Sequence, residues 1–570
     1  MTALPLVPAA FQPDISPVAD SLAISALVAL LPLITVFLTL GVLRWKAHWA
    51  GLTAVAVAIV VASVFFGMPL GLAVLSATQG AAFGLFPIMW IVFTAILLYQ
   101  VTVRSGRFED LRATFHLISD DPRVQAIIIA FCFGGLLEAL AGFGAPVAIT
   151  GVMLMALGFS PLRAAAVVLL ANTAPVAFGA VGTPIITAGN LTGIPYQEIG
   201  AYVGHQTPVL AAFVPLFLCL LADGRRGVRE CWPVALVTGL AFAVTQWVSA
   251  TWISVELTDI IASLVGLGAA AVMLRFWQPT GTAEASARLL RDREDELAGM
   301  TDAERAARPQ DAPRAAGRAP LTGQRILMAL FPYLLVIVVF SAAKLIPPVT
   351  TFLASTDVKV PWPGLNGRLL TVGGQVSTAT VYSWQWLSSP GTMLLICAFI
   401  VALVYRVTMR QFVGEIGATA HKLRFSILTI ASVLALAYVM NFSGQTITIG
   451  TFIAGAGPLF AWLSPILGWV GTAVTGSDTS ANALFATLQQ TAGQHAGIDP
   501  TLLVAANTSG GVVGKMISPQ NLTIAATAVG LLGRESDILR KMLPWSVGLL
   551  ALLCVLIGLQ STPVLSWMLP

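Results

Sequence analysis

The chain has 570 residues, of which 57% are hydrophobic and 10% are charged, against roughly 25% charged residues in ordinary soluble domains. This composition excludes a soluble globular domain and predicts a protein embedded in lipid. The formal net charge of +4 comes from Lys and Arg residues in short segments between apolar runs, which argues against a nucleic-acid partner.

Apolar runs long enough to cross a bilayer follow one another along the chain. Residues 21–43 form the first run, and the first Lys or Arg of the chain, Arg44, follows it. A signal peptide needs a basic segment before its apolar core, so we expect a retained membrane helix and not a cleaved signal peptide. No charged residue occurs in residues 49–103, which suffice for two crossings. Further uncharged runs are residues 231–255, 260–274, 326–343, 390–405 and 542–559. The sequence predicts an all-α polytopic membrane protein with about 12–14 transmembrane helices, some of them discontinuous or re-entrant.

The basic residues predict the orientation in a bacterial cytoplasmic (inner) membrane. Segments that carry several Lys or Arg should be cytoplasmic, whereas the N-terminal tail, the turn near Gly67 and the tail after Leu559 have no basic residue and should lie outside. Both termini are therefore predicted to be periplasmic. The basic segments begin at Arg44, Arg104, Arg225, Arg275, Arg406 and Arg534.

Three regions are expected: a first membrane half (residues 1–275), a charged linker (276–324) and a second membrane half (325–570). Residues 278–324 mix seven Arg with eight Asp or Glu and four Pro, which predicts a partly helical cytoplasmic linker. Residues 347–389 are rich in Gly and Thr and contain three Trp, which suits a periplasmic loop near the headgroups.

An internal repeat links the two halves. Residues 171–184 (ANTAPVAFGAVGTP) align without gaps to residues 506–519 (ANTSGGVVGKMISP), at a separation of 507 − 172 = 335. Chance similarity between apolar stretches is the alternative. Cytoplasmic Arg123 lies 49 residues before Asn172, but Arg424 lies 83 before Asn507, and the difference of 34 allows one extra crossing. We therefore expect inverted repeats, with cores at about residues 124–222 and 425–533, as in secondary transporters.

Each half also contains an interruption inside apolar sequence. Gly142, Gly144 and Pro146 interrupt the first half, and Gly476 and Ser477 interrupt the second. Broken backbone in a membrane must be buried in protein or line a wet cavity, and the new helix N-termini can bind a carboxylate. A purely structural kink is the alternative at each place.

Four ionisable residues lie within apolar sequence: Glu138, Arg163, Asp478 and Lys515. A charge in the membrane costs about 3 kcal/mol or more, so each needs a partner or a function. Glu138 and Asp478 are expected to couple protons. Lys515 could pair with either acid or with the substrate; Asp478 is the expected partner because both belong to the second repeat, which leaves Glu138 as the proton carrier. Structural carboxyls and a structural ion pair are the alternatives, and Arg163 is expected to extend towards the membrane surface.

The remaining reactive residues predict no chemistry. Five cysteines stand alone and are expected to be reduced, and His205 and His495 are expected to be packing or loop residues. The sequence contains no nucleophile–base pair, metal-ligand spacing or Walker loop. We therefore expect no catalytic residue, no metal and no cofactor.

Four motifs carry a resemblance to a known family. They are residues 134–146 (GGLLEALAGFGAP), residues 172–184 (NTAPVAFGAVGTP), residues 476–485 (GSDTSANALF) and residues 507–521 with GKMISP at 514–519. The chain resembles the lactate permease family of bacterial secondary transporters, whose members carry L-lactate, D-lactate and glycolate by proton symport. Related broken helices and Asn-Thr motifs occur in sodium-driven anion carriers, so the coupling ion stays open.

The expected protein is thus a permease for small 2-hydroxy monocarboxylates, with the carboxylate, protons and the lipid bilayer as its partners. A sodium-coupled carrier is the first alternative, and an anion channel or a membrane-embedded enzyme is the second. The predicted substrate-binding residues line one shared anion site between the halves: Gly142, Gly144, Asn172, Thr173, Gly476, Ser477, Asn482, Asn507, Thr508, Ser509 and Lys515.

Overall fold

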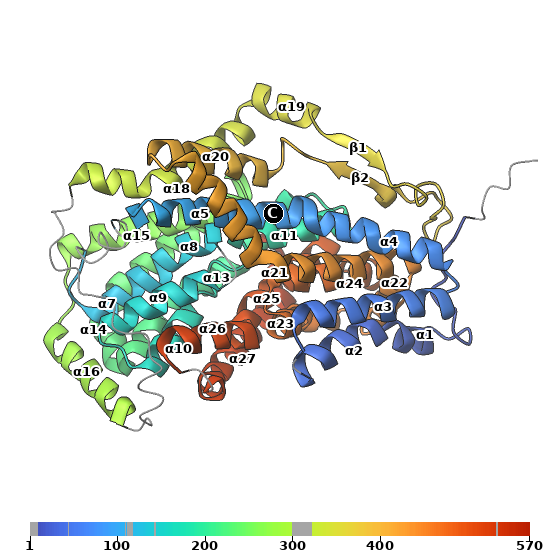
Figure 1. Cartoon of the computed structure of the whole chain (residues 1–570). Helices are drawn as coiled ribbons and strands as arrows, with labels where there is room; N and C mark the ends of the chain where they lie inside the picture. Colours follow the sequence, from blue (N-terminus) through green and yellow to red (C-terminus); the bar gives the residue numbers. More distant parts are fainter. Residues whose placement is uncertain are drawn as a thin grey trace, which may run out of the picture.

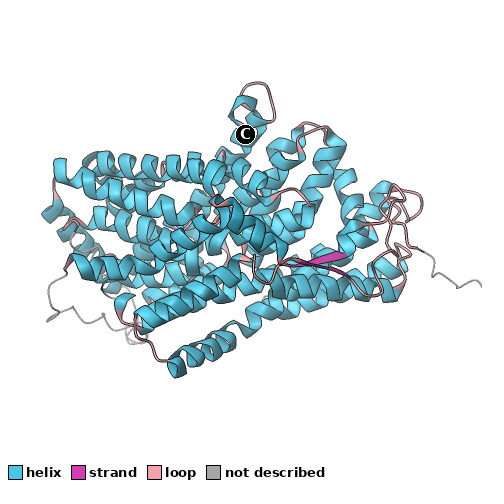
Figure 2. Cartoon of the chain, turned by 90° about the horizontal axis from the view of Figure 1, so that it is seen from above, coloured by secondary structure: helices cyan, strands magenta, loops and turns pink. Residues whose placement is uncertain are grey.

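A computed structural model describes residues 10–43, 45–108, 110, 118–141, 144–298, 322–531 and 534–570. Figure 2 shows that helices make up almost all of this part of the chain. The all-α expectation is therefore confirmed, apart from one short pair of strands.

The first half of the chain supplies helices up to the charged linker. Their bounds are α1 (Leu22–Ala29), α2 (Leu31–Phe37), η1 (Leu38–Val42), α3 (Ala47–Val64), α4 (Leu70–Phe83), η2 (Gly84–Met89), α5 (Trp90–Arg104), α7 (Pro122–Ala126), η3 (Ile127–Phe133), α8 (Gly134–Ala141), α9 (Ala145–Ala156), α10 (Pro161–Ala171), α11 (Gly179–Thr192), α12 (Tyr196–Gly204), α13 (Thr207–Ala211), α14 (Val214–Val248), η4 (Ser249–Ile253), α15 (Thr258–Phe276) and α16 (Thr282–Ala298).

The second half continues in the same way after the linker. Its elements are α18 (Gly323–Leu345), α19 (Pro347–Ser355), β1 (Val358–Pro361), η5 (Thr378–Thr380), β2 (Val381–Trp384), α20 (Pro390–Val404), α21 (Met409–Ser443), α22 (Gln445–Ala454), α23 (Leu459–Thr475), α24 (Asp478–Ala496), α25 (Pro500–Gly514), η6 (Lys515–Ile517), α26 (Pro519–Val529), α27 (Glu535–Gln560) and η7 (Ser566–Met568).

The described residues contain nine helical segments long and apolar enough to cross a membrane, and five shorter apolar helices of 10–17 residues. One of the nine, Tyr196–Ile253, has 58 residues, and about 20 residues suffice for one crossing. It turns back at Asp223 and Gly224, where the φ of Gly224 is +64°. The chain is thus a multi-pass membrane protein, and the number of 12–14 crossings stays a prediction.

Both predicted interruptions lie at the tips of helical hairpins. In hairpin 2 (α23 and α24), Ser464 exchanges hydrogen bonds of 2.8 and 2.9 Å with Gln489, so the two arms run antiparallel on either side of Gly476. The left-handed φ of Gly476, +77°, turns the chain at the tip, and the Ser477 hydroxyl accepts from Ser480 N–H to begin α24.

Hairpin 1 is formed by residues 122–141 and by α9. An added Cβ at Gly134 would lie 3.8 Å from Cγ2 of Thr150, which places the two arms against each other. Gly144 has a φ of +82° at the start of α9. Gly142 lies outside the described residues.

The repeat motifs interrupt two further helices. Between α10 and Thr183 the backbone is irregular, with left-handed φ values of +44° at Ala180 and +59° at Val181, which L-residues adopt only under strain. In the second half η6 separates α25 from α26, and Ser518 begins the new helix.

Elements from the two halves cover each other. In Figure 1, α26 of the second half lies beside α9 of hairpin 1, and Ile524 fills the space in which a side chain at Gly144 would lie. Conversely, α11 of the first half packs on α24, where Asn482 Nδ2 donates to the Pro184 carbonyl at 3.1 Å. The inverted relation of the repeats is not tested by these contacts and stays a prediction.

The charged linker is partly helical, as expected, but its helix is not free in solution. Ala285 and Leu289 of α16 are buried, and Arg288 binds Asp223 with two hydrogen bonds of 2.9 and 2.6 Å. Arg163 forms an ion pair of 2.7 Å with Asp292 of α16, and its extension towards the membrane surface stays a prediction. The sequence pattern missed this docking because the partner charges come from distant parts of the chain.

A fully buried arginine anchors the same region. The Arg123 guanidinium forms ion pairs with Asp121 (2.7 Å), Asp223 (3.2 Å) and Glu230, and it donates to the Thr280 carbonyl. Burial alone would raise the pKa of Asp121, but the hydrogen bonds and charge of Arg123 hold that pKa below its ordinary value. Asp223 of α14 thus links Arg123 of hairpin 1 to Arg288 of α16.

The predicted loop at residues 347–389 contains α19 and the antiparallel strands β1 and β2, which pair Val358 with Trp384. Phe11 bridges to Leu369 of this loop, so the described N-terminal residues lie on the same side. Figure 1 shows β1 and β2 at the opposite end of the helix bundle from α16. Opposite ends are what the predicted cytoplasmic and periplasmic positions require, and these positions stay predictions.

Candidate functional site

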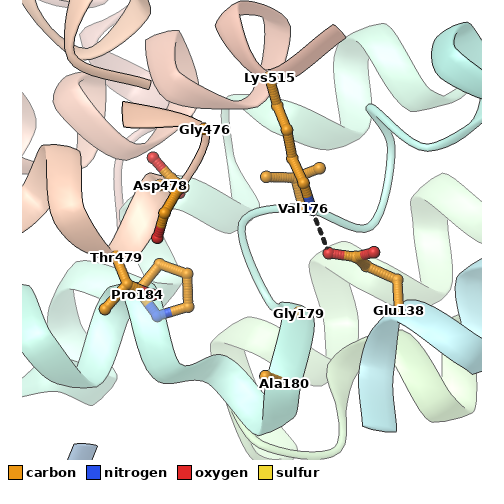
Figure 3. A pocket seen from close by; sticks show the side chains of 10 residues that line it. Glu138, Val176, Gly179, Ala180, Pro184, Gly476, Asp478, Thr479 and Lys515 are labelled. Atoms are coloured by element: carbon orange, nitrogen blue, oxygen red, sulfur yellow. Dashed lines mark hydrogen bonds and ion pairs between the residues drawn. The ribbon is translucent and has the colours of Figure 1, made fainter. Parts of the chain in front are cut away.

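A small cavity lies where the interrupted elements of both halves meet (Figure 3). The centre of a water-sized sphere can move through about 30 Å³ of it, which is space for about two water molecules. Its walls come from α8, the irregular segment before α11, the tip of hairpin 2 and η6. The lining residues are Glu138, Val176, Gly179, Ala180, Pro184, Gly476, Ser477, Asp478, Thr479 and Lys515.

Lys515 forms an ion pair with Glu138, across the boundary between the two halves (Figure 3). The side chains are 9% and 3% exposed, so the pair is screened little by water. The expectation that Lys515 pairs with Asp478 is therefore wrong. The reason is spatial: η6 passes beside α8, which brings Glu138 within reach although it is 377 residues away in sequence.

Two first-half residues shape the position of Glu138. Asn172 Nδ2 donates to Glu138 Oε2 at 2.9 Å, so this amide of the repeat motif holds the carboxylate and does not point to open space. Gly179 has no side chain, and a Cβ there would lie 3.0 Å from Glu138 Oε1. Glu138 is thus bound by one cation and one amide, which satisfies its charge.

Asp478 lies on another side of the cavity and is bound far less well (Figure 3). Its Oδ1 accepts only a long hydrogen bond of 3.4 Å from Thr472 Oγ1, and among the described residues its Oδ2 has no hydrogen-bond partner. Asp478 is 4% exposed. An ionised carboxylate at that depth lacks compensation, which favours the neutral acid in this conformation.

The first turn of α24 faces the cavity. Gly476, Ser477 and Thr479 line it, and backbone N–H groups in the first turn of a helix have no acceptor within the helix. Such an N-terminus attracts an anion through its N–H groups and its dipole. Together with Lys515, it gives the cavity the donors that a carboxylate needs.

The other predicted binding residues lie outside the cavity wall. Asn507 Nδ2 donates to Asn482 Oδ1 at 2.9 Å, and Thr508 and Asn482 are hydrogen-bonded to each other at 2.9–3.1 Å. Ser509 donates to Gln206 Oε1 at 2.6 Å, and Thr173 donates to the Leu170 carbonyl at 2.6 Å. These buried side chains join hairpin 2, α25 and α11. Their role in substrate binding is untested.

Several residues of the region escaped sequence reasoning. Val176, Gly179, Ala180 and Pro184 line the cavity and belong to the repeat motif, so the motif itself was the signal. Asp259 is 1% exposed at the start of α15, but its position at the edge of an apolar run resembles an ordinary loop acid.

His205 is held in one neutral form by two partners. Trp247 Nε1–H donates to His205 Nε2 at 2.7 Å, and the opposite nitrogen, Nδ1, lies 2.7 Å from the Ala201 carbonyl. Because an indole N–H only donates and a carbonyl only accepts, the proton belongs on Nδ1. This supports the interpretation of His205 as a packing residue. All five cysteines are free, and within the described ranges no group of three His, Cys, Asp or Glu could hold a metal ion.

A multi-pass helical protein whose halves enclose a small polar cavity beside hairpin tips and interrupted helices has the architecture of a membrane transporter. The family model described as L-lactate permease matches residues 25–564. The chain therefore belongs to the L-lactate permease family.

Named relatives agree with that assignment. The chain is 41% identical to the L-lactate permease of Bacillus subtilis, over 97% of this chain and 99% of the relative, and 41% identical to the glycolate permease GlcA of Escherichia coli, over 95% and 96%. A solved structure, the YdaH transporter of Alcanivorax borkumensis, is similar at 15% identity over 75% of this chain and 87% of that one, with a TM-score of 0.30.

Proposed function

We propose that the protein imports lactate and related small 2-hydroxy monocarboxylates, such as glycolate, by proton symport across the bacterial cytoplasmic membrane. Its family and the names of its relatives support the class of substrate. The observation that carries the coupling mechanism is the buried ion pair between Lys515 and Glu138 in the cavity wall.

The substrate carboxylate competes with Glu138 for the Lys515 ammonium. Lys515 is the one cation among the residues that line the cavity. The N-terminus of α24, with Ser477 and Thr479, supplies N–H and hydroxyl groups for the carboxylate and the 2-hydroxyl. Because the cavity has space for only about two water molecules, the tip of hairpin 2 must move when lactate enters.

Charge balance then couples the substrate to a proton. The empty site holds Lys515 and Glu138 as a neutral pair. An anion bound to Lys515 would leave Glu138 ionised, buried and without its cation, at a cost of several kcal/mol. A proton on Glu138 removes that cost. The loaded site is again neutral, with one proton for each monocarboxylate, and both leave together. Asp478 stays neutral throughout and donates to the substrate.

Proteoliposomes with imposed gradients test this proposal. The purified protein should accumulate labelled lactate when the outside is made acidic, and glycolate should compete with it. A sodium gradient at equal pH should not drive uptake. Uptake driven by sodium alone would contradict proton coupling, and flux without counterflow would indicate an anion channel.

A further inference from the structure

Asp259 is a buried acid that does not line the cavity. It lies at the start of α15, 1% exposed, and none of the ion pairs among the described residues involves it. Its Oδ1 accepts from Gln246 Nε2 at 3.0 Å, but its Oδ2 is buried with no hydrogen-bond partner in the described part of the chain. An ionised carboxylate there would be almost uncompensated.

The charged groups nearest to Asp259 are already engaged. Glu138 on α8 and Lys515 on η6 both act on it electrostatically, but they form an ion pair with each other. Glu256, in the loop before α15, accepts from Tyr196 (2.8 Å) and Ser254 (2.7 Å) hydroxyls.

Among the side chains that the structure describes, the other elements packed on α15 add no cation to Asp259. The π-helical segment η3 contributes the thiol of Cys132, and α14 contributes the neutral amide of Gln246. α18 carries the phenol of Tyr333 and the guanidinium of Arg325, which binds Asp110 at 2.5 Å.

A hydrogen-bonded bridge joins Asp259 to the cavity wall. Gln246 Nε2 donates both to Asp259 Oδ1 and to the Ala174 carbonyl, at 3.0 and 3.1 Å. Ala174 lies two residues after Asn172 and two residues before Val176. Asn172 holds Glu138, and Val176 lines the cavity. The same amide group of Gln246 thus binds both Asp259 and the segment that leads to the cavity wall.

We propose that Asp259 is a proton-binding site outside the cavity, whose bound proton keeps the Ala174–Val176 wall in place through Gln246. Its proton remains bound during exchange and is distinct from the proton carried with the substrate. Asp259 is therefore a positioning residue. The inference rests on the proposed function only for the choice of lactate as the assayed substrate.

Infrared spectroscopy of the purified protein tests the protonation directly. The difference spectrum between the parent and Asp259→Asn should contain the C=O band of a carboxylic acid at neutral pH. The matched control is Glu256→Gln, whose carboxylate has two hydroxyl donors, and it should show a carboxylate band instead. A carboxylate band lost in Asp259→Asn would overturn the proposal.

Lactate–lactate exchange tests the positioning role. Because exchange needs no net proton movement, the test remains informative if proton symport is wrong. As the pH rises past the titration of Asp259, the protonated fraction and the parent's exchange rate should fall about tenfold per pH unit. The exchange rate of Asp259→Asn should fall less steeply by the same factor, because only the proton that binds with the substrate still makes its exchange pH-dependent. The same fall in both proteins would overturn the proposal.

Gln246→Met provides a second route if Asp259→Asn does not fold. It leaves the acid and removes the bridge, so the carboxylic-acid band should persist while exchange becomes slow at every pH. Unchanged exchange in folded Gln246→Met would show that the bridge does not position the wall.

Discussion

Lys515 and Glu138 lie 377 residues apart in sequence, yet they form a buried ion pair that closes one side of the cavity. Each half of the chain thus supplies one charge, and neither half has a complete site. Among the described residues, Asp478 therefore has no ion-pair partner.

The pair predicts which acid carries the proton. Glu138→Gln cannot take up or lose a proton, so it should not accumulate lactate above the outside concentration, while lactate–lactate exchange survives. Asp478→Asn preserves the neutral form and should retain both activities. Both variants are checked for folding by thermal melting. Loss of accumulation in Asp478→Asn with retention in Glu138→Gln would assign the proton to Asp478 and contradict the mechanism.

The effects of replacing Lys515 and Glu138 on the free energy of unfolding should be non-additive. Lys515→Met leaves Glu138 buried without its cation and should lower the free energy of unfolding by about 3–5 kcal/mol. The double variant Glu138→Gln/Lys515→Met should recover most of this loss, because neither charge remains. Melting temperatures of the two single variants and the double variant form the cycle. Additive losses would mean that the two side chains do not interact in the membrane.

The two repeat asparagines should respond differently to truncation. Asn172→Ala removes the amide that orients Glu138, so it should weaken lactate binding while the melting temperature changes little. Asn507→Ala leaves Asn482 Oδ1 with one donor fewer in a buried network, which costs about 1–3 kcal/mol of stability. Binding assays in detergent and thermal melting separate the two effects. Equal loss of affinity at unchanged stability in both would restore the symmetric binding role.

The predicted orientation can be tested with two exposed positions, one in the charged linker and one near the C-terminus. Single cysteines at Ala287, on the exposed side of α16, and at Ser566 should be labelled from opposite sides of the membrane. The half-buried Cys554 is replaced first to remove background labelling. Labelling of both from the same side would make the predicted topology wrong.

Sequence reasoning predicted the components of the site but not their pairing. Glycines and a proline inside apolar runs predicted interruptions of helices around Gly144 and Gly476, and the structure shows that both interruptions are hairpin tips. The partner of Lys515 could not be predicted, since sequence distance favoured Asp478 and only the packing of η6 on the first half decides for Glu138. Asp259 was not predicted for a similar reason. Its burial depends on the packing of α14 and α8 against α15, and a hydropathy pattern along the sequence does not show which helices pack together.

The contact between Gly144 and Ile524 has a consequence for synthesis of the protein. The two residues are separated by 524 − 144 = 380 positions, and a ribosome that adds about 5–20 residues per second needs roughly 20–80 s to make that length. During that interval the face of α9 that later receives α26 has no intramolecular cover and must be covered by lipid or by the insertion machinery. A ribosome stalled before α26 would therefore leave a nascent chain whose first half is inserted but unfinished, and such chains should be preferred substrates for membrane quality-control proteases.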